Sequence, residues 1–223
     1  FAAFLYYEWC QLLGPVPGAL GMALRKFFWP AMFGNCGKGC MFASGITLRQ
    51  PCKIHLGEDV VLSEGCILDG RHGTEPVSIR LGNNVILSND VMISCKNGTV
   101  SIGNDCGINA RTIIQSTNNC PVVIGDCIIG QQCFLVGGGS YHIDRLDIPI
   151  REQGIRADGG VCLEEDVWLG GNVTVLGGVT MGKGSVAGAS ALLTRSVAAY
   201  TISLGMPARV VKKRTVRKTM GEV

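Results

Sequence analysis

The chain has few aromatic residues, few histidines and no long uninterrupted apolar run. Aromatic residues make up only 6% of 223 residues, so smaller aliphatic side chains must fill the interior. Its three histidines, His55, His72 and His142, are too scattered along the chain to converge readily on one zinc ion. Neither apolar segment near the N-terminus reaches the roughly 20 uninterrupted residues that a membrane-spanning helix needs. The sequence therefore predicts no metal centre and no transmembrane helix.

Cysteine is plentiful but does not follow a disulfide or zinc pattern. The total of 11 is odd, and no paired C-x-x-C motifs occur. Four cysteines fall where valine or alanine would serve equally well in a short sequence repeat: Cys66, Cys106, Cys127 and Cys133. A free cysteine behaves as a small hydrophobic residue and is often buried. We therefore expect a protein of a reducing compartment, the cytoplasm.

The net charge of +3 is concentrated at the C-terminal end. The cluster consists of Arg209, Lys212, Lys213, Arg214, Arg217 and Lys218. Such a cluster is typical of a site for a phosphate-bearing ligand or an anionic surface, and equally of a solvated tail. It has no interleaved aromatic residues, which disfavours nucleic-acid binding.

A six-residue period is the dominant pattern of the chain. It is clearest in Leu163, Leu169, Val175, Met181, Ala187 and Leu193, and recurs in shorter runs such as Val123, Ile129 and Leu135. Glycine, asparagine and aspartate crowd the positions between. Ordinary strands alternate every second residue and helices every 3.6 residues, whereas a period of six with turn residues in each unit indicates a β-solenoid. Eighteen such units between residues 54 and 197 predict six triangular turns.

Interruptions of the period divide the chain into segments. We expect an apolar helical segment and lead-in at 1–50, a solenoid at 51–198 and a short basic segment at 199–223. Two modest interruptions occupy 69–80 and 115–122, and a long one occupies 136–162. Long loops on a regular solenoid usually lie on the functional face, so 136–162 is the predicted active-site loop.

Residues 1–33 form two apolar stretches of helical character separated by Gly-Pro-Val-Pro-Gly. One interpretation packs them over the first turn of the solenoid or against a neighbouring subunit. The other lays them on the inner face of a membrane. In that case Tyr6, Tyr7, Trp9 and Trp29 would lie at headgroup depth, and Arg25 and Lys26 would face lipid phosphates.

The second half of the solenoid resembles a known family. The segments that carry this resemblance are DVWLGGNVTVLGGVTMGKGSVAGAS at 166–190, LTRSV at 193–197 and GMPARVVK at 205–212. They are similar to the hexapeptide-repeat acyltransferases, nearest to the galactoside, maltose and polysaccharide O-acetyltransferase branch. This resemblance implies an all-β, left-handed parallel β-helix, an exception to the usual right-handed crossover. It also implies a homotrimer with active sites between subunits, acetyl-CoA as the usual donor and no metal.

The resemblance also implies an acceptor side. Gly139-Ser-Tyr-His-Ile-Asp resembles the family segment that carries the catalytic histidine, so His142 is the predicted general base. Tyr141 and Asp144 flank it as candidate acceptor contacts, and Asp144 is also a candidate to orient or stabilise the imidazole. Asn109 matches an asparagine that faces the acceptor and the developing oxyanion, although it could equally be a turn residue of the solenoid.

On the donor side, the resemblance assigns a coil edge of small residues to the pantetheine arm and basic residues to the phosphates. The implied acetyl-CoA residues are Trp168, Gly170, Gly171, Ala189, Thr194, Arg195, Arg209 and Lys212. The expected activity is O-acetylation of a sugar, glycan or natural product. A non-catalytic scaffold and N-acetylation of an amino sugar remain as alternatives, and the sequence does not name the acceptor or the acyl length.

Overall fold

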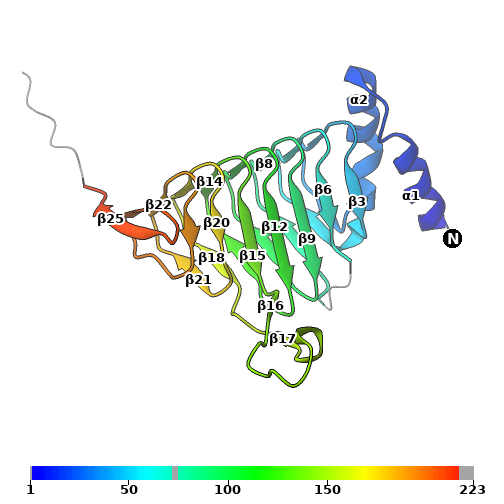
Figure 1. Cartoon of the computed structure of the whole chain (residues 1–223). Helices are drawn as coiled ribbons and strands as arrows, with labels where there is room; N and C mark the ends of the chain where they lie inside the picture. Colours follow the sequence, from blue (N-terminus) through cyan, green and yellow to red (C-terminus); the bar gives the residue numbers. More distant parts are fainter. Residues whose placement is uncertain (1, 72–74, 216–223) are drawn as a thin grey trace, which may run out of the picture.

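The computed structural model describes residues 2–71 and 75–215. Two helices, α1 (Ala2–Leu12) and α2 (Gly18–Phe28), and the short 3-10 helix η1 (Trp29–Met32) come first. A triangular solenoid follows and fills most of the chain. The helices lie across its first turn, and strand β25 lies at the opposite end (Figure 1).

Three parallel sheets form the three sides of the solenoid, which we call faces A, B and C. Face A contains β1 (Asn35–Cys36), β4 (Ile54–Leu56), β7 (Ile79–Leu81), β10 (Val100–Ile102), β13 (Val122–Ile124), β18 (Val161–Leu163) and β21 (Val179–Met181). Face B contains β2 (Met41–Phe42), β5 (Val61–Leu62), β8 (Ile86–Leu87), β11 (Gly107–Ile108), β14 (Cys127–Ile129), β19 (Val167–Leu169), β22 (Val186–Ala187), β24 (Thr201–Leu204) and the antiparallel β25 (Arg209–Lys213).

Face C contains β3 (Thr47–Arg49), β6 (Ile67–Asp69), β9 (Met92–Lys96), β12 (Ile113–Thr117), β15 (Phe134–Gly137), β20 (Thr174–Val175) and β23 (Leu192–Leu193). A two-stranded hairpin of β16 (Ser140–Tyr141) and β17 (Ile155–Arg156) interrupts the solenoid between faces C and A. Short 3-10 helices are η2 (Pro51–Lys53) and η3 (Ile150–Glu152). The fold is a left-handed parallel β-helix, as predicted.

Stacked aliphatic side chains hold the turns together. On face A the inward residues pair in register and are at most 2% exposed: Leu56, Leu81, Ile102, Ile124, Leu163 and Met181. Burying one such side chain contributes about 1.5–3 kcal/mol. The corners between faces A and B need a left-handed backbone, which Asp59, Asn84, Asp105 and Asp166 adopt with φ between 53° and 57°. Asparagine and aspartate tolerate this conformation better than most residues.

The predicted repeat needs two corrections. The solenoid has about seven turns, because β1, β2 and β3 form a turn inside the segment that the sequence assigned to the helices and lead-in. Its inward residues Cys36, Phe42 and Leu48 do keep the spacing of six. Val123 is not an inward residue: it is 43% exposed, and Ile124 pairs with Ile102 in the core instead. The unit before Ile129 is therefore one residue short.

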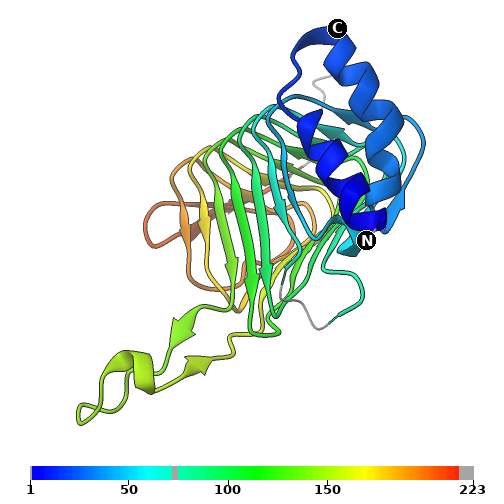
Figure 2. The ribbon, with the colours of Figure 1, turned by 90° about the vertical axis from the view of Figure 1, so that its right-hand side faces the viewer.

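The N-terminal helices pack against the first turn of the solenoid, as the first interpretation expects (Figure 2). Trp29 is fully buried against Phe42, and Phe33 stacks on the same ring. Arg25 is 1% exposed and donates hydrogen bonds to four backbone carbonyls, so the prediction that it faces lipid phosphates is wrong. The prediction that Trp29 lies at headgroup depth is wrong for the same reason. Across the described residues, every helix is too short or too polar to cross a membrane.

Candidate functional site

A groove of about 1040 Å³ runs over face B at the C-terminal end of the solenoid. Strands β19 and β22 form its floor, and β24 and β25 form one wall. Five of the eight predicted acetyl-CoA residues line it: Trp168, Gly170, Gly171, Ala189 and Lys212. The indole of Trp168 is 54% exposed on the floor, so it offers an apolar surface to a ligand.

Small residues form one edge of this face-B groove because neighbouring turns approach closely there. A Cβ at Gly170 would lie 2.6 Å from the backbone nitrogen of Ala189, closer than the backbone allows. The strand register places Gly170 between Gly130 and Gly188 on successive turns, at the corner between faces B and C. The edge therefore presents backbone with few side chains, which suits a thin amide-bearing ligand.

Basic residues mark the end of the groove. Lys212 lines it from β25, and Arg214 donates to Asp166 at 2.9 Å and to the carbonyl of Gly184 at 2.7 Å. Arg209 lies on the same strand, is exposed and donates to the carbonyl of Ala208, outside the groove. Two members of the predicted basic cluster, Arg217 and Lys218, lie outside the described residues.

His142 follows β16 on the hairpin, which projects away from the solenoid (Figure 2). Its backbone nitrogen donates to the carbonyl of Gly154 at 3.1 Å, and its side chain is 47% exposed. A small hollow of about 250 Å³ beside it is lined by Asp144, Arg145 and Gln153 among others. Within one chain, His142 therefore stands apart from the face-B groove.

The two candidate neighbours of His142, Asp144 and Tyr141, are both exposed. Asp144 Oδ2 lies 3.9 Å from His142 Nδ1, which is an ion-pair distance and too long for a hydrogen bond. The Asp144 side chain is 86% exposed, and its role in orienting the ring stays a prediction. Tyr141 is 47% exposed on β16, where a bound acceptor would be able to reach its hydroxyl.

Asn109 follows β11 and extends the small-residue edge of the groove toward the N-terminus. In the strand register it precedes Gly130 and Gly170 on the same corner, two turns before Gly170. Its side-chain Nδ2 donates to the carbonyl of Ile129 at 2.8 Å, so the amide helps to bind adjacent turns together. An amide group has two N–H donors, and one is therefore left for a ligand.

Thr194 and Arg195 are exposed after β23, at the corner between faces C and A. They do not line the face-B groove. The hairpin leaves the solenoid at the same corner, two turns earlier. One chain thus carries the predicted donor residues partly on face B with its edge and β25, and partly on the corner between faces C and A, whereas the predicted base is on the hairpin.

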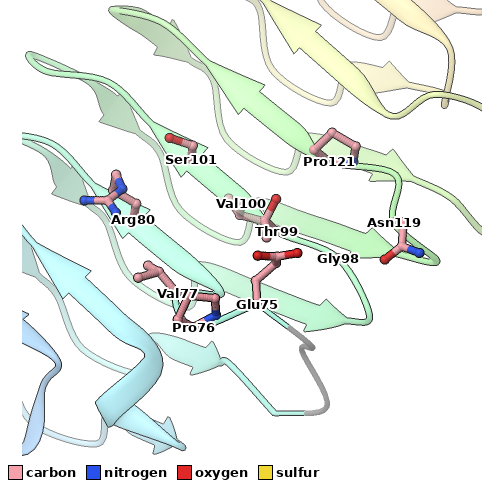
Figure 3. A pocket seen from close by; sticks show the side chains of 10 residues that line it. All are labelled: Glu75, Pro76, Val77, Arg80, Gly98, Thr99, Val100, Ser101, Asn119 and Pro121. Atoms are coloured by element: carbon pink, nitrogen blue, oxygen red, sulfur yellow. The ribbon is translucent and has the colours of Figure 1, made fainter.

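Sequence reasoning missed two further hollows. One, of about 560 Å³ on face A, is lined by described residues of the interruptions 69–80 and 115–122 and of the turn between them, and it includes Glu75, Arg80 and Asn119 (Figure 3). The other, of about 940 Å³, lies between α1 and the first turn, with Tyr6 and Phe33 in its wall. The interruptions themselves were the available signal for the first hollow. The apolar stretches predicted that the helices pack on the first turn, but no sequence signal indicated a hollow between them.

The three faces differ in polarity. The outward row of face B is nearly all apolar and in register: Met41, Val61, Ile86, Gly107, Ile128, Trp168, Val186 and Ile202. Face C presents Thr47, Ile67, Met92, Ile113, Phe134, Thr174 and Leu192. Face A presents mainly polar residues: Asn35, His55, Arg80, Ser101, Val123, Cys162 and Thr180. Two faces are therefore suited to contact another chain.

The repeat cysteines lie in the core, as the sequence predicted. Cys66, Cys106, Cys127 and Cys133 are at most 2% exposed, and all are free thiols. Burial raises the pKa of Cys66 to about 11 and that of Cys127 to about 12, so these thiols stay protonated at neutral pH. Within residues 2–71 and 75–215, no three His, Cys, Asp or Glu side chains are grouped so that they could hold a metal ion.

Known proteins were compared with this chain by sequence and by fold. The chain matches no family model. A probable acetyltransferase of Mycobacterium tuberculosis is 33% identical over 115 residues, which are 52% of this chain and 35% of that protein. The chain spans about a third of the length of the curated relatives it matches.

Solved structures share the fold at low sequence identity. AntD, an N-acyltransferase from Bacillus cereus solved in complex with dTDP and 3-hydroxybutyryl-CoA, is 19% identical with a TM-score of 0.55, covering 83% of this chain and 85% of that one. A hexapeptide transferase family protein from Anaplasma phagocytophilum is 17% identical with a TM-score of 0.50, covering 80% and 82%.

Proposed function

We propose that the chain is a hexapeptide-repeat acyltransferase and that it transfers an acetyl group from acetyl-CoA to a hydroxyl group. The acceptor class is a sugar, glycan or natural product. The observation that carries the proposal is the face-B groove, which gathers five of the eight residues predicted for acetyl-CoA. The galactoside, maltose and polysaccharide branch stays a prediction.

The groove fits the chemistry of acetyl-CoA. Its edge at Gly170 and Gly188 leaves room for the pantetheine arm, and Trp168 offers the arm an apolar surface. Lys212 supplies positive charge at the end of the groove for the phosphates. The nucleotide would therefore lie toward β25, and the thioester would lie toward the turns that carry Asn109.

In the proposed reaction, His142 acts as the general base. Its imidazole takes the proton of the acceptor hydroxyl as that oxygen attacks the thioester carbonyl carbon. The new C–O bond forms, the C–S bond breaks, and the imidazolium returns the proton to the CoA thiolate. In this proposal the second N–H of Asn109 stabilises the oxyanion that develops on the carbonyl oxygen.

The active site is proposed to form between subunits of a homotrimer. In one chain the hairpin leaves at the corner between faces C and A, whereas the groove lies on face B. The apolar outward rows of faces B and C are different surfaces, so their contact is heterologous, and a heterologous contact can close into a ring. A neighbouring chain would then bring His142 to the groove.

Complementation in mixed trimers tests this shared site. His142→Ala chains lack the base, and Ala189→Trp chains have a blocked groove. Each should be inactive alone, and refolding them together should restore part of the activity, because some sites combine an intact groove with an intact His142. A mixture that stays inactive, although both parents fold as trimers, would contradict the shared site.

We also propose a peripheral contact of the N-terminal helices with the inner face of a membrane. Exposed apolar side chains line one side of each helix: Leu5, Trp9 and Leu12 on α1, and Leu20 and Phe27 on α2. Flotation with anionic vesicles should retain the parent protein and lose a Trp9→Ser, Phe27→Ser double variant. Equal recovery of both proteins would rule out this contact.

Product analysis tests the activity itself. The protein is incubated with acetyl-CoA and a panel of sugars, glycolipids and amino sugars, and products are identified by mass spectrometry and alkaline lability. An alkali-labile acetate ester supports O-acetylation. N-acetylation of an amino sugar is the second candidate, because AntD is an N-acyltransferase, and a stable amide product would favour it. Acetyl-CoA binding with no product from any acceptor would favour a non-catalytic scaffold.

A further inference from the structure

The hairpin that carries His142 is attached to the solenoid through a narrow neck. It leaves the coil after β15 and returns at β18. Its two strands pair only at Ser140 with Arg156 and at Tyr141 with Ile155, followed by the bond from His142 to Gly154. The hairpin stands clear of the solenoid (Figure 2). The position of His142 therefore depends on the direction that the neck imposes.

Glycine occupies both sides of the neck. Gly138 and Gly139 on the outgoing strand have φ of 72° and 117°, and Gly159 and Gly160 on the returning strand have φ of 89° and 85°. All four adopt backbone conformations that other residues rarely reach. Glycine without a side chain restrains the backbone little, so another group must fix the angle of the hairpin.

The carboxylate of Asp158 provides that restraint. The backbone nitrogen of Gly138 donates to both of its oxygens, at 2.9 and 3.0 Å, and the nitrogen of Gly160 donates to Oδ1 at 2.9 Å. One side chain thus joins the two strands of the neck. It also lies against Gly177 of the next turn, where an added Cβ would come within 1.9 Å of Oδ2.

We infer that Asp158 is a positioning residue for acyl transfer: by clamping the neck of the hairpin, it sets where His142 meets the groove. This inference rests on the proposed role of His142 as base. Asp158 itself does not reach the reacting atoms. Bonds from backbone N–H groups to an ionised carboxylate are among the stronger hydrogen bonds, so this clamp is suited to holding a glycine-rich neck.

Two variants of Asp158 separate positioning from general stability. Asp158→Ala removes all three bonds, and Asp158→Asn keeps one acceptor oxygen. Asp147→Ala is the matched control, because it removes an equally negative side chain from the tip of the same hairpin, where Asp147 pairs with Arg145. Hydrogen exchange and steady-state kinetics are measured on the full-length proteins.

We expect Asp158→Ala to speed amide exchange at Gly138, His142 and Gly160 at least about tenfold, and the control to leave these amides near the parent rate. A shift of about 1 Å in a catalytic group can cost on the order of 100-fold in rate. We therefore expect kcat to fall about 10- to 100-fold in Asp158→Ala and less in Asp158→Asn. The KM for acetyl-CoA should stay within about threefold, since the neck is not part of the groove.

Unchanged exchange at these amides in both Asp158 variants would overturn the clamp, whatever the activity. Increased exchange with an unchanged kcat would overturn the positioning role. If the parent protein shows no acyl transfer, the proposed function fails, and the exchange measurements still decide whether Asp158 holds the hairpin. If Asp158→Ala does not fold, the same criteria apply to Asp158→Asn.

Discussion

The helices α1, α2 and η1 form an N-terminal cap on the solenoid. Replacing Arg25 by methionine should destabilise this cap strongly, although Arg25 is remote from the groove. Its guanidinium is 1% exposed and donates to the carbonyls of Phe42 (3.0 Å), Leu13 (2.8 Å), Gly14 (3.2 Å) and Val16 (2.7 Å). It also lies 5.9 Å from the centre of the Trp29 ring. Arg25 thus joins α2, the turn after α1 and the first turn of the solenoid.

The magnitude follows from two opposing contributions. The contacts come from Nε and Nη1, which together carry three N–H groups, so one N–H is shared between two carbonyls. Hydrogen bonds from a charged donor contribute about 1.5–3 kcal/mol each, so three would contribute roughly 4.5–9 kcal/mol. Burial of the charge costs several kcal/mol, and the same burial lowers the pKa of Arg25. Methionine keeps the aliphatic stem, removes the charge and leaves four buried carbonyls without this donor. A net loss of about 3–5 kcal/mol is expected, as for breaking other buried charge networks.

Urea unfolding followed by Trp29 fluorescence, with Trp9 and Trp168 replaced by phenylalanine, reports on the cap. The matched control is Lys26→Met, which removes a neighbouring exposed charge and should change stability by less than about 0.5 kcal/mol. Should Arg25→Met unfold within about 1 kcal/mol of the parent, the cap does not depend on these bonds. The hydrogen bonds of Arg25 would then not be what attaches the helices to the solenoid.

Three further predictions concern charge and assembly. Lys212→Ala should weaken acetyl-CoA binding by about 1–3 kcal/mol in calorimetry. If Lys212 or Arg195 contacts the 3′-phosphate, replacing that residue by alanine should weaken the binding of dephospho-CoA less than the binding of CoA. Equal losses of affinity for both ligands would show that the residue does not contact the 3′-phosphate. Ile128→Glu places a charge on the apolar row of face B and should convert the proposed trimer to monomers, as measured by light scattering. The control Ser101→Glu on the polar face A should leave the trimer intact. A parent protein that is itself monomeric would refute the trimer. Burial opposes ionisation of Asp69, but hydrogen bonds from Arg71 and Arg49 hold its pKa below the ordinary 3.8. Its ionised form therefore stabilises the fold fully above the ordinary 3.8, and the effect is lost as the pH falls through the lowered pKa of the folded state. Asp69→Asn should thus be less stable than the parent at pH 7, and the difference should shrink in strong acid; a difference that stays constant down to full protonation would contradict the assignment.

The repeat was predictable because each inward position has the same physical requirement. Leu163, Leu169 and Val175 fill a narrow core at a spacing of six, and any aliphatic residue satisfies that need. The same tolerance explains the misplacement of Val123, since Val123 and Ile124 both fit the pattern and only the strand pairing decides between them. The first turn escaped prediction because Cys36 and Phe42 occupy its inward positions in place of aliphatic residues.

The candidate site was predictable only in part. Resemblance in the second half of the chain pointed to residues that do line one groove, such as Gly170 and Ala189. Contacts between residues far apart in sequence carry no local pattern. The bonds from Gly138 to Asp158 and from Arg25 to Phe42 are of this kind, and an apolar helix pattern did not indicate that Arg25 is buried.

Turnover of the His142→Ala variant tests the central claim most directly. CoA release is followed at saturating acetyl-CoA with an acceptor identified by product analysis, and acetyl-CoA binding is measured in parallel. Loss of a positioned general base should lower kcat by about 10²- to 10⁴-fold. The dissociation constant for acetyl-CoA should stay near that of the parent, since the imidazole is proposed to act on the acceptor hydroxyl, whereas the nucleotide would be bound at the Lys212 end of the groove. A variant that retains nearly full turnover would show that His142 is not the base in this reaction.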